Sequence, residues 1–526
     1  MRRALWAVLA VTILLVPASP GGGERGALRA QRPEEPDPGR VLRVGVTRLP
    51  TLDPAQARSV DQILVADQLF DSLTTVEPTT LEPAPALAER WQVSPDQRQW
   101  DFVLRVGATF SNGRPITAGD VKYSLERVAR PGSGSPVADV LHPLSGYDAF
   151  RKNAAPQLAG ITTPAPNVVH FSLDEPWAVL PSALSSPVFG VVAPESAEAQ
   201  GPGPTITDEP VTSGPFKVGR QRGETLVLTP APGTTTKLAG IDVVRLNDLG
   251  TAYQSFKDGD LDFVRVPADD ITDAGRRYGR QGFRPYLAEL FYGFNLKNPK
   301  FADPRFREAI VRGIDRQAIV TAIYQGTVRP TDTPVLDGVL GYQNYSCERC
   351  RHDPVRAQAL LQEAFRGNPP PPIFLDYDDD ATQDAIAKAI QASLRQVGIT
   401  ANLRPKAPRE YDVFALSDET ELLRLGWIAN YPSIDAILPP LFRSESPDNL
   451  TGFASPGVDN LLRAARGESD PSRRLQLYQD VERGIMEQVP VVPLAQFNVH
   501  SVIAKRAKGV KLNSYGSFDA AAVRVG

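Results

Sequence analysis

Histidine and cysteine are scarce in this 526-residue chain, which contains four of the first and two of the second. So few imidazoles argue against histidine-based catalysis and a histidine-rich metal centre. The GxSxG, P-loop and HExxH motifs are absent as well, which removes the familiar hydrolase, nucleotide-binding and metalloprotease signatures. We therefore expect no metal, no cofactor and no enzymatic activity. A pair of acid–base carboxylates is the catalytic alternative, because such partners meet in space and not in sequence.

An excess of positive charge is lacking too. Lysine and arginine number 57 against 61 aspartate and glutamate residues, a formal net charge of −4, so no nucleic-acid partner is expected. Proline, by contrast, is abundant at 49 residues, which suits many turns between short elements. With 42% hydrophobic residues, the chain can bury a large core and is too long for one ordinary domain.

The N-terminus carries a short apolar run. Arg2 and Arg3 precede a thirteen-residue run over 4–16 that is apolar except for Thr12, and PASPGGGERG follows. This is the layout of a secretory signal, and the run falls short of the roughly 20 residues that a membrane-spanning helix needs. We expect export, with residues 1–40 as signal segment and flexible tether, and an uncleaved anchor as the alternative. No cysteine stands directly after the run, so no lipid-anchor cysteine is expected.

The two cysteines, Cys347 and Cys350, stand in YSCERCRHDP. In an exported protein such a pair is expected to form a small local disulfide. A redox pair and a metal site that includes His352 are the alternatives. A metal site needs a further ligand, and the other histidines are far away in sequence; a thioredoxin-like pair should open a helix beside a strand.

Alternating and helical patterns follow one another along the chain. VLRVGVTRL, WDFVLRV and NVVHFSL alternate as half-buried strands do. Three later helices are expected to begin with Asp-Pro, at 303–304, 353–354 and 470–471. The aspartate side chain can cap the helix by accepting backbone N–H groups. Proline has no backbone N–H, but the first turn of a helix does not use that donor. The first of these helices is expected to end at Gly326.

A strand–helix–strand unit is predicted between 373 and 403, where PIFLDY, a helix and ITANL follow one another and imply parallel pairing. An acidic run, Asp376 with 378–380, lies at its first turn. This run lacks the glycine and ligand spacing of a calcium loop, so we expect a solvated loop that caps the following helix. Together the patterns predict a mixed α/β protein with more than one lobe.

Several stretches, in the expected order, resemble the extracytoplasmic solute-binding proteins of ABC importers for peptides and nickel, the oligopeptide- and dipeptide-binding family 5. The resemblance covers nearly all of 41–526. It rests on WDFVLRVGATFSNGRPITAGDVKYSLER, TSGPFKV, FKDGDLD, FYGFNLKNPKFADPRFREAIVRGIDR, GWIANYPSIDAIL and VPVVPLAQFNVHSVIAKRAKGV.

The resemblance implies an α/β Venus-flytrap fold, the two-lobed periplasmic-binding-protein fold, with mixed sheets and an extra third subdomain. Lobe I is expected from 41–77, 205–297 and 500–526. The inserted subdomain II is expected from 78–204, and lobe II from 298–499. A chain that crosses between lobes more than once suits a hinge that closes on a ligand.

Residues that match the family's cleft segments are the candidate ligand-binding residues. In GWIANYP, Trp427 and Tyr431 are expected to face the cleft, with a place in the core as the alternative. Family members usually carry an acid where Asn430 stands, and that acid takes the α-amine of a peptide. A neutral amide cannot balance a buried ammonium. Either another acid, such as Asp435, substitutes, or the ligand has no buried amine.

Four further positions match ligand-side segments of the family. Tyr292 and Asn295 stand in FYGFN, a segment near the cleft and hinge, whose phenylalanines are expected in the core. Leu49 and Pro50 stand in the turn after the first strand.

The resemblance therefore implies a receptor that captures a peptide-like solute and delivers it to an ABC permease, without covalent chemistry. We expect a monomer that partners with the permease subunits. One alternative is a non-peptide cargo such as a nickel chelate, haem or a sugar, which the neutral Asn430 favours. Another is a membrane-tethered sensory receptor with the same fold.

Overall fold

The computed structural model describes residues 40–48, 50–198, 209–345 and 347–526. The signal segment and tether predicted over 1–40 lie, except for Arg40, outside the described residues. Within the described chain, no helix combines the length and the apolar character that crossing a membrane requires.

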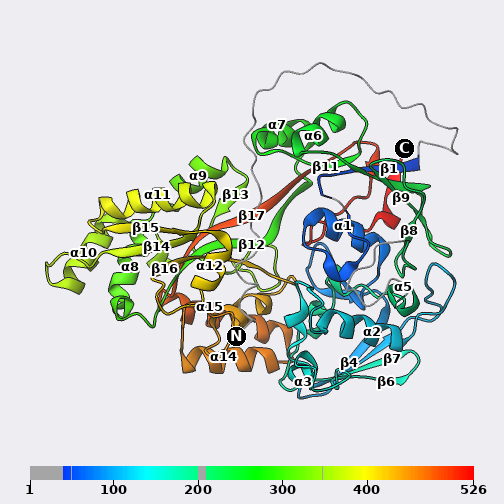
Figure 1. Cartoon of the computed structure of the whole chain (residues 1–526), viewed down its shortest axis with the longest axis horizontal. Coiled ribbons are helices and arrows are strands. Elements are labelled where there is room, and N and C mark those ends of the chain that lie inside the picture. Colours follow the sequence, from blue (N-terminus) through cyan, green and yellow to red (C-terminus); the bar gives the residue numbers. More distant parts are fainter. Residues whose placement is uncertain (1–39, 49, 199–208, 346) are drawn as a thin grey trace.

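Most strands of the described chain join one large mixed sheet (Figure 1). In spatial order its strands are β15 (Ala401–Lys406), β14 (Ile373–Asp378), β16 (Leu422–Ile428), β12 (Gly282–Phe294), β17 (Val491–Ile503), β11 (Phe263–Arg265), β1 (Val41–Val46), β10 (Gly240–Arg245), β9 (Thr225–Pro230) and β8 (Phe216–Val218), with β13 (Val328–Pro330) also paired to β17. Parallel pairs, such as β14–β15 and β1–β10, occur beside antiparallel ones, such as β12–β16 and β12–β17. The prediction of mixed sheets is confirmed.

The two long strands β12 and β17 connect the two halves of this sheet. They pair with each other from Gly282 opposite Ser501 to Gly293 opposite Val491. On one side β12 also pairs with β16, and on the other side β17 also pairs with β11. The strands predicted for lobe I and those predicted for lobe II are thus joined through one continuous pair, which Figure 1 shows crossing the middle of the molecule. The division into lobes at 297/298 and 499/500 stays a prediction.

A small antiparallel sheet lies wholly within the range predicted for subdomain II. Its strands, in spatial order, are β4 (Ala88–Val93), β5 (Gln99–Leu104), β7 (Val168–Ser172) and β6 (Ile161–Ala165). Helix α2 (Ala118–Ala129) packs on β6 and β7. Trp100, Phe102 and Leu104 are buried, as their alternation predicts, and the ring of Phe102 meets that of Phe171 edge to face at 5.4 Å.

The three Asp-Pro dipeptides begin helices as predicted. The side chains of Asp303, Asp353 and Asp470 accept backbone N–H groups of the first turn at 2.7–2.9 Å. Each cap of this kind stabilises its helix by about 1 kcal/mol. The helices are α8 (Pro304–Gly313), α10 (Pro354–Phe365) and α15 (Pro471–Met486).

The first of these helices is shorter than the prediction, which placed its end at Gly326. The backbone is extended at Ile314, and Asp315 caps a second helix, α9 (Arg316–Tyr324), by accepting the N–H of Ala318 at 2.9 Å. The apolar stripe of the sequence continues through both helices, so the stripe alone does not reveal the break.

The strand–helix–strand unit is present as predicted. Strands β14 and β15 are parallel, with Ile373 opposite Ala401, and α11 (Ala381–Gln396) connects them. The disulfide that joins Cys347 and Cys350 lies before α10, with both residues buried and the sulfur atoms 1.99 Å apart.

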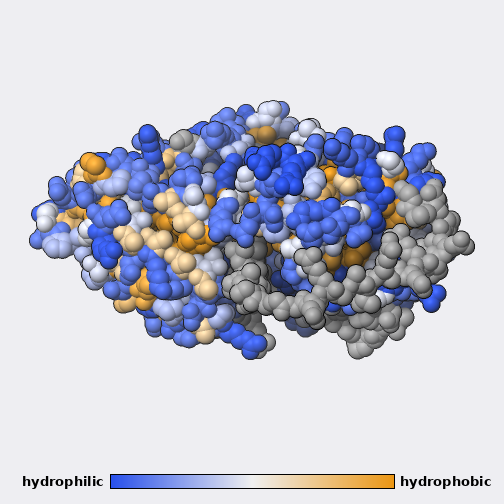
Figure 2. Space-filling view, turned by 90° about the horizontal axis from the view of Figure 1, so that it is seen from above, coloured by the Kyte–Doolittle hydropathy of each residue, from blue (hydrophilic) through white to orange (hydrophobic). Residues whose placement is uncertain are grey.

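Four of the remaining longer helices pack on the large sheet, and the fifth packs on α15. They are α1 (Val60–Leu69), α6 (Leu249–Lys257), α7 (Ile271–Tyr278), α12 (Pro408–Phe414) and α14 (Pro456–Gly467). Figure 2 shows a mainly hydrophilic face with apolar residues in small groups. Large apolar side chains that are exposed, such as Val106 and Val355, are scattered in sequence and are ordinary for a protein surface.

The chain returns from the small sheet to the large one through Gly214, which lies against the C-terminal end of α1. Its N–H donates to the carbonyl oxygen of Leu69 at 2.9 Å. A Cβ atom there would lie 2.7 Å from the Leu69 carbonyl carbon and 2.8 Å from the Phe70 nitrogen. Both neighbours are backbone atoms, which cannot rotate away.

Gly214→Ala is therefore expected to lower the free energy of unfolding by about 1–3 kcal/mol, as overpacked sites do. The control is Gly457→Ala, because Gly457 is exposed in α14 and a Cβ atom there meets nothing within 4 Å. Urea denaturation followed by tryptophan fluorescence measures both. Equal stabilities of the two variants would contradict the close approach at Gly214.

Candidate ligand-binding site

The candidate segment GWIANYP begins at the end of β16, where the chain leaves the large sheet. Trp427 is half-buried there, packed against the core on one side and exposed on the other. Its indole N–H donates to the carbonyl oxygen of Ala436 at 2.7 Å, which folds the following turn back against the strand. Asn430, at the tip of this turn, is half-buried as well. The two side chains therefore remain partly accessible to a solute.

Tyr431 and Asp435, from the same segment, point the other way. Asp435 is 2% exposed and Tyr431 is 5% exposed. The hydroxyl of Tyr431 donates to Asp435 Oδ2 at 2.7 Å, and the rings of Tyr431 and Trp177 meet at 6.3 Å. The structure places Tyr431 in the core, which was the alternative to a position facing the cleft.

Asp435 is the centre of a buried polar cluster. It accepts hydrogen bonds from the Trp177 indole at 2.8 Å, from Tyr431 and from the hydroxyl of Tyr478, and Nε of Arg466 lies 3.2 Å from its Oδ1. Burial, with the neighbouring Asp435 charge, holds the pKa values of both tyrosines well above their usual range, so the hydroxyls stay donors. The Asp435 carboxylate is therefore committed to protein donors.

The same cluster joins the range of the small sheet to the C-terminal helices. Trp177 lies in the range predicted for subdomain II, while Asp435 and Arg466 lie in the range predicted for lobe II. Beside them, Glu175 pairs with Arg443 at 2.7 Å and with Arg466 at 3.4 Å. The segment after Asn430 thus holds two parts of the molecule together.

The other predicted site residues lie apart from Trp427. Tyr292 on β12 is fully buried. The N–H of Asn295 donates to the carbonyl oxygen of Glu421, six positions before Trp427, so about 20 Å of strand separates the two. Pro50 is half-buried in the turn after β1, beyond β17 in the sheet order, and Leu49 lies outside the described residues.

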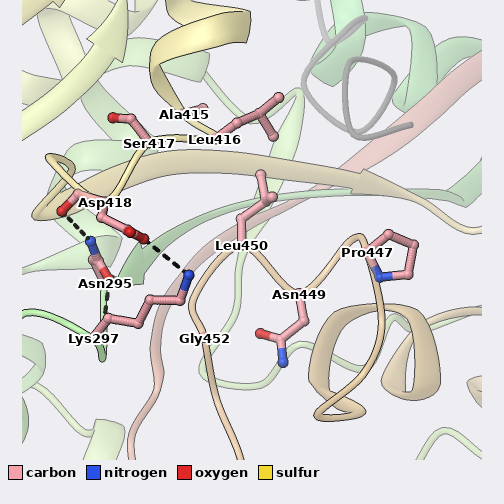
Figure 3. A pocket seen from close by; sticks show the side chains of 10 residues that line it. All are labelled: Asn295, Lys297, Ala415, Leu416, Ser417, Asp418, Pro447, Asn449, Leu450 and Gly452. Atoms are coloured by element: carbon pink, nitrogen blue, oxygen red, sulfur yellow. Dashed lines mark hydrogen bonds and ion pairs between the residues drawn. The ribbon is translucent and has the colours of Figure 1, made fainter. Parts of the chain in front are cut away.

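Asn295 belongs to a small polar pocket at the start of β16 (Figure 3). Its amide donates to the carbonyl oxygens of Asp418 and Thr420 at 3.1 and 3.0 Å, and Lys297 pairs with the Asp418 carboxylate at 3.0 Å. The cavity measures about 210 Å³, below the roughly 300–1,000 Å³ of most ligand pockets. The amide holds the loop before β16 to the end of β12.

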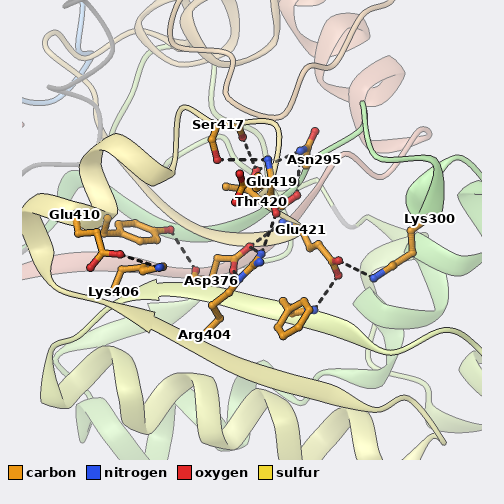
Figure 4. A network of polar contacts seen from close by, with 12 residues as sticks. Asn295, Lys300, Asp376, Arg404, Lys406, Glu410, Ser417, Glu419, Thr420 and Glu421 are labelled. Atoms are coloured by element: carbon orange, nitrogen blue, oxygen red, sulfur yellow. Dashed lines mark hydrogen bonds and ion pairs between the residues drawn. The ribbon is translucent and has the colours of Figure 1, made fainter.

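The acidic run differs in part from the prediction. Asp380 caps α11 through the N–H groups of Thr382 and Gln383, as expected. Asp376, however, is fully buried in β14, where it pairs with Arg404 and accepts the Glu421 N–H at 2.7 Å (Figure 4). The prediction of a solvated loop is wrong for Asp376, because the strand extends through it and Arg404 on β15 supplies a partner. No group of three potential metal-ligating residues occurs in the described chain.

Glu289 is a residue that the sequence analysis missed. It lies on β12 directly opposite Trp427 on β16 and Gln496 on β17. It is fully buried, and neither carboxyl oxygen has a hydrogen-bond partner within the described chain. Burial and the nearby Glu482 raise its pKa well above the usual range. The signal was present as a single acid inside the apolar strand YLAELFYGF.

Glu482, on α15, is a second buried acid. Its Oε1 accepts the hydroxyl of Thr333, while its Oε2 has no hydrogen-bond partner in the described part of the chain. Burial raises its pKa to about 7. Burial therefore favours the neutral form of both carboxyl groups.

The fold and this segment define a two-lobed solute-binding protein. The model of the bacterial extracellular solute-binding proteins, family 5 Middle, matches residues 82–449. The chain belongs to this family.

Comparisons with individual proteins are consistent with this family. The dipeptide-binding protein DppE of Bacillus subtilis (strain 168) is 25% identical over 457 residues, which cover 83% of each chain. The di/tripeptide-binding protein 2 of Pseudomonas aeruginosa (strain UCBPP-PA14) is 26% identical over 490 residues, 88% of this chain and 90% of the relative. The MppA periplasmic murein tripeptide-binding protein, in an unliganded open form, has the same fold: the TM-score is 0.79 at 23% identity over 92% of this chain and 97% of that one.

Asp435→Asn removes the charge at the centre of the buried cluster and leaves Arg466 short of a partner. We expect the free energy of unfolding to fall by about 3 kcal/mol, because a broken buried ion pair leaves an uncompensated charge. Asp418→Asn is the control, since Asp418 is 79% exposed and its pair with Lys297 contributes about 0–1 kcal/mol. Urea denaturation compares them, and losses of the same size would contradict the central role of Asp435.

Glu482→Gln tests the buried acid through pH. Because the folded pKa of about 7 lies above the unfolded value, folding favours the neutral acid, and the stability contribution is lost as pH rises from about 4 through 7. The variant should exceed the wild type in free energy of unfolding by roughly 3 kcal/mol at pH 8 and match it at pH 4. Glu487→Gln, at the exposed end of the same helix, should show no such trend. A pH-independent difference for Glu482→Gln would contradict the assignment.

Proposed function

We propose that the protein is the extracytoplasmic substrate-binding receptor of an ABC importer, which captures a peptide-like solute between its lobes and delivers it to a membrane permease. The observation that carries the proposal is the partly exposed pair Trp427 and Asn430 at the end of β16, in a chain of family 5. An amphipathic aromatic beside an amide suits a site that binds main-chain amides and apolar side chains. The names of the relatives, which bind dipeptides, tripeptides and a murein tripeptide, support a peptide-like cargo.

In this proposal the solute contacts both halves of the large sheet. Trp427 and Asn430 contribute from the β16 side, and Pro50 from the turn after β1. The shared strands β12 and β17 act as the hinge, so the predicted lobes (41–77, 205–297 and 500–526 against 298–499, with 78–204 inserted) close about them. Tyr292 and Asn295 then support the site from within the protein.

The further parts of the proposal follow from the role of such receptors. Family 5 consists of solute-binding proteins, and we propose that this chain likewise has no catalytic activity and needs no cofactor. We propose that it is exported by its N-terminal segment, acts as a monomer and contacts the permease subunits of its importer.

A non-peptide cargo is the second candidate, and a specific observation favours it. Asn430 is neutral where relatives are expected to carry an acid, and Asp435 is occupied by three hydrogen-bond donors and an ion pair with Arg466. A solute without an ammonium group would fit this segment without a new charge partner.

Native mass spectrometry of the protein purified from its own host tests the proposal, with denaturation to release and identify the cargo. We expect a mixed set of short peptides. A single non-peptide mass would overturn the peptide and favour the second candidate. Protein that remains empty, and stays empty after incubation with a tripeptide library, would contradict the importer role.

Trp427→Ala is expected to lower the affinity for a bound tripeptide library at least tenfold, because the exposed side of the indole is lost from the site. Trp91→Ala is the matched control, since Trp91 is also half-buried but lies on β4 of the small sheet. Isothermal titration calorimetry measures both variants against the wild type. An unchanged affinity of Trp427→Ala would assign Trp427 to the core alone.

A further inference from the structure

The acid expected at position 430 is missing, and the structure contains an unused one nearby. We propose that Glu289 supplies the negative charge that balances a cationic group, the α-ammonium of a peptide, on a solute bound at Trp427. The inference rests on the proposed function and adds its specificity: a preference for peptides with a free amino terminus.

The position of Glu289 in the sheet carries the proposal. Directly opposite residues of an antiparallel pair share a face, with Cβ atoms about 5 Å apart, so Glu289 lies beside Trp427. The pairing of β12 with β17 shifts register on both sides of it, between Pro285 and Glu289 and between Leu290 and Phe291. Such irregularities in a ladder re-aim side chains and concentrate near functional sites.

The carboxyl group of Glu289 is not engaged by any partner in the described chain. Both oxygens are without a hydrogen-bond partner in the described chain, although a buried polar atom is normally paired. An unpaired acid in the core costs stability, so a role other than stability is needed to explain its presence. A cation that arrives with the solute would supply the partner that the protein does not.

The surrounding groups leave Glu289 as the available acid. Asp435 is bound by Trp177, Tyr431, Tyr478 and Arg466. Glu482, from α15, is the charged group that acts on Glu289, and one of its oxygens is bound by Thr333.

A cation on the β17 side is also occupied. From β13, Arg329 lies one strand further, where Asp337 pairs with it at 3.1 Å and Gln496 Oε1 accepts from it at 2.7 Å. Among the described residues that face this position, no cation therefore neutralises Glu289.

The proposal predicts a proton balance. In the empty protein, burial and the neighbouring Glu482 raise the pKa of Glu289 and so favour its protonated form. A bound ammonium stabilises the carboxylate, because opposite charges attract strongly in a low-dielectric interior. The carboxyl proton then leaves to the solvent, the ammonium keeps its own protons, and binding releases up to one proton per solute. Affinity for such solutes should therefore rise with pH while the ligand amine stays charged.

Titration calorimetry at pH 6.5, in buffers of different ionisation enthalpy, tests the proposal. The probes are an equimolar tripeptide library with free amino termini and the same library after N-acetylation. For the wild type we expect release of nearly one proton with the free-amine library, none with the acetylated library, and a preference for the first of at least tenfold. For Glu289→Gln we expect no proton release and a preference within about twofold.

Two controls separate the possible failures. Glu482→Gln, which removes the neighbouring acid, should keep the preference for the free amine. Binding of the acetylated library by Glu289→Gln, within twofold of the wild type, checks that the variant is folded. If Glu289→Gln retains both the preference and the proton release, the inference is overturned while the proposed function stands. If the wild type binds neither library, the proposed function is overturned and the inference with it.

Discussion

The pairing of β12 with β17 is the constraint on which the rest of the molecule depends. These two strands are long enough to extend from one half of the large sheet into the other, and every other strand of that sheet attaches on one side of them or the other. Backbone hydrogen bonds therefore join segments that are hundreds of residues apart in sequence. A pair of strands shared by two parts of a protein suits a hinge about which those parts can close on a ligand.

The segment from the end of β16 to Asp435 has two parts with different roles. Its first part, Trp427 to Asn430, ends the strand and remains partly exposed. Its second part, through Asp435, forms a buried cluster with Trp177 and Arg466 that attaches the small-sheet range to the C-terminal helices. A buried carboxylate is tolerated only with partners that offset its desolvation. That requirement explains why aromatic hydroxyl and indole donors gather around it, and why this acid is not free to take a ligand amine.

Much of the fold could be predicted from local chemistry. Each Asp-Pro dipeptide began a helix, because capping depends on neighbours within one turn. The strand–helix–strand unit and the alternating strands appeared where the periodicity placed them. The predictions that differed concern longer range: Asp376 is buried because Arg404, on the next strand, pairs with it, and the helix predicted to reach Gly326 breaks at Ile314 although its apolar stripe continues.

The sequence by itself determined the class of protein, the positions of most helices and strands, and the absence of an acid at Asn430. Only the tertiary structure decided which side chains of the candidate segment face the protein and which remain accessible. It also placed Glu289 beside Trp427, more than a hundred residues away in sequence. The physical reason is that capping and periodicity act between neighbours along the chain, whereas burial, charge partners and cross-strand contacts are set by strand pairing between distant segments.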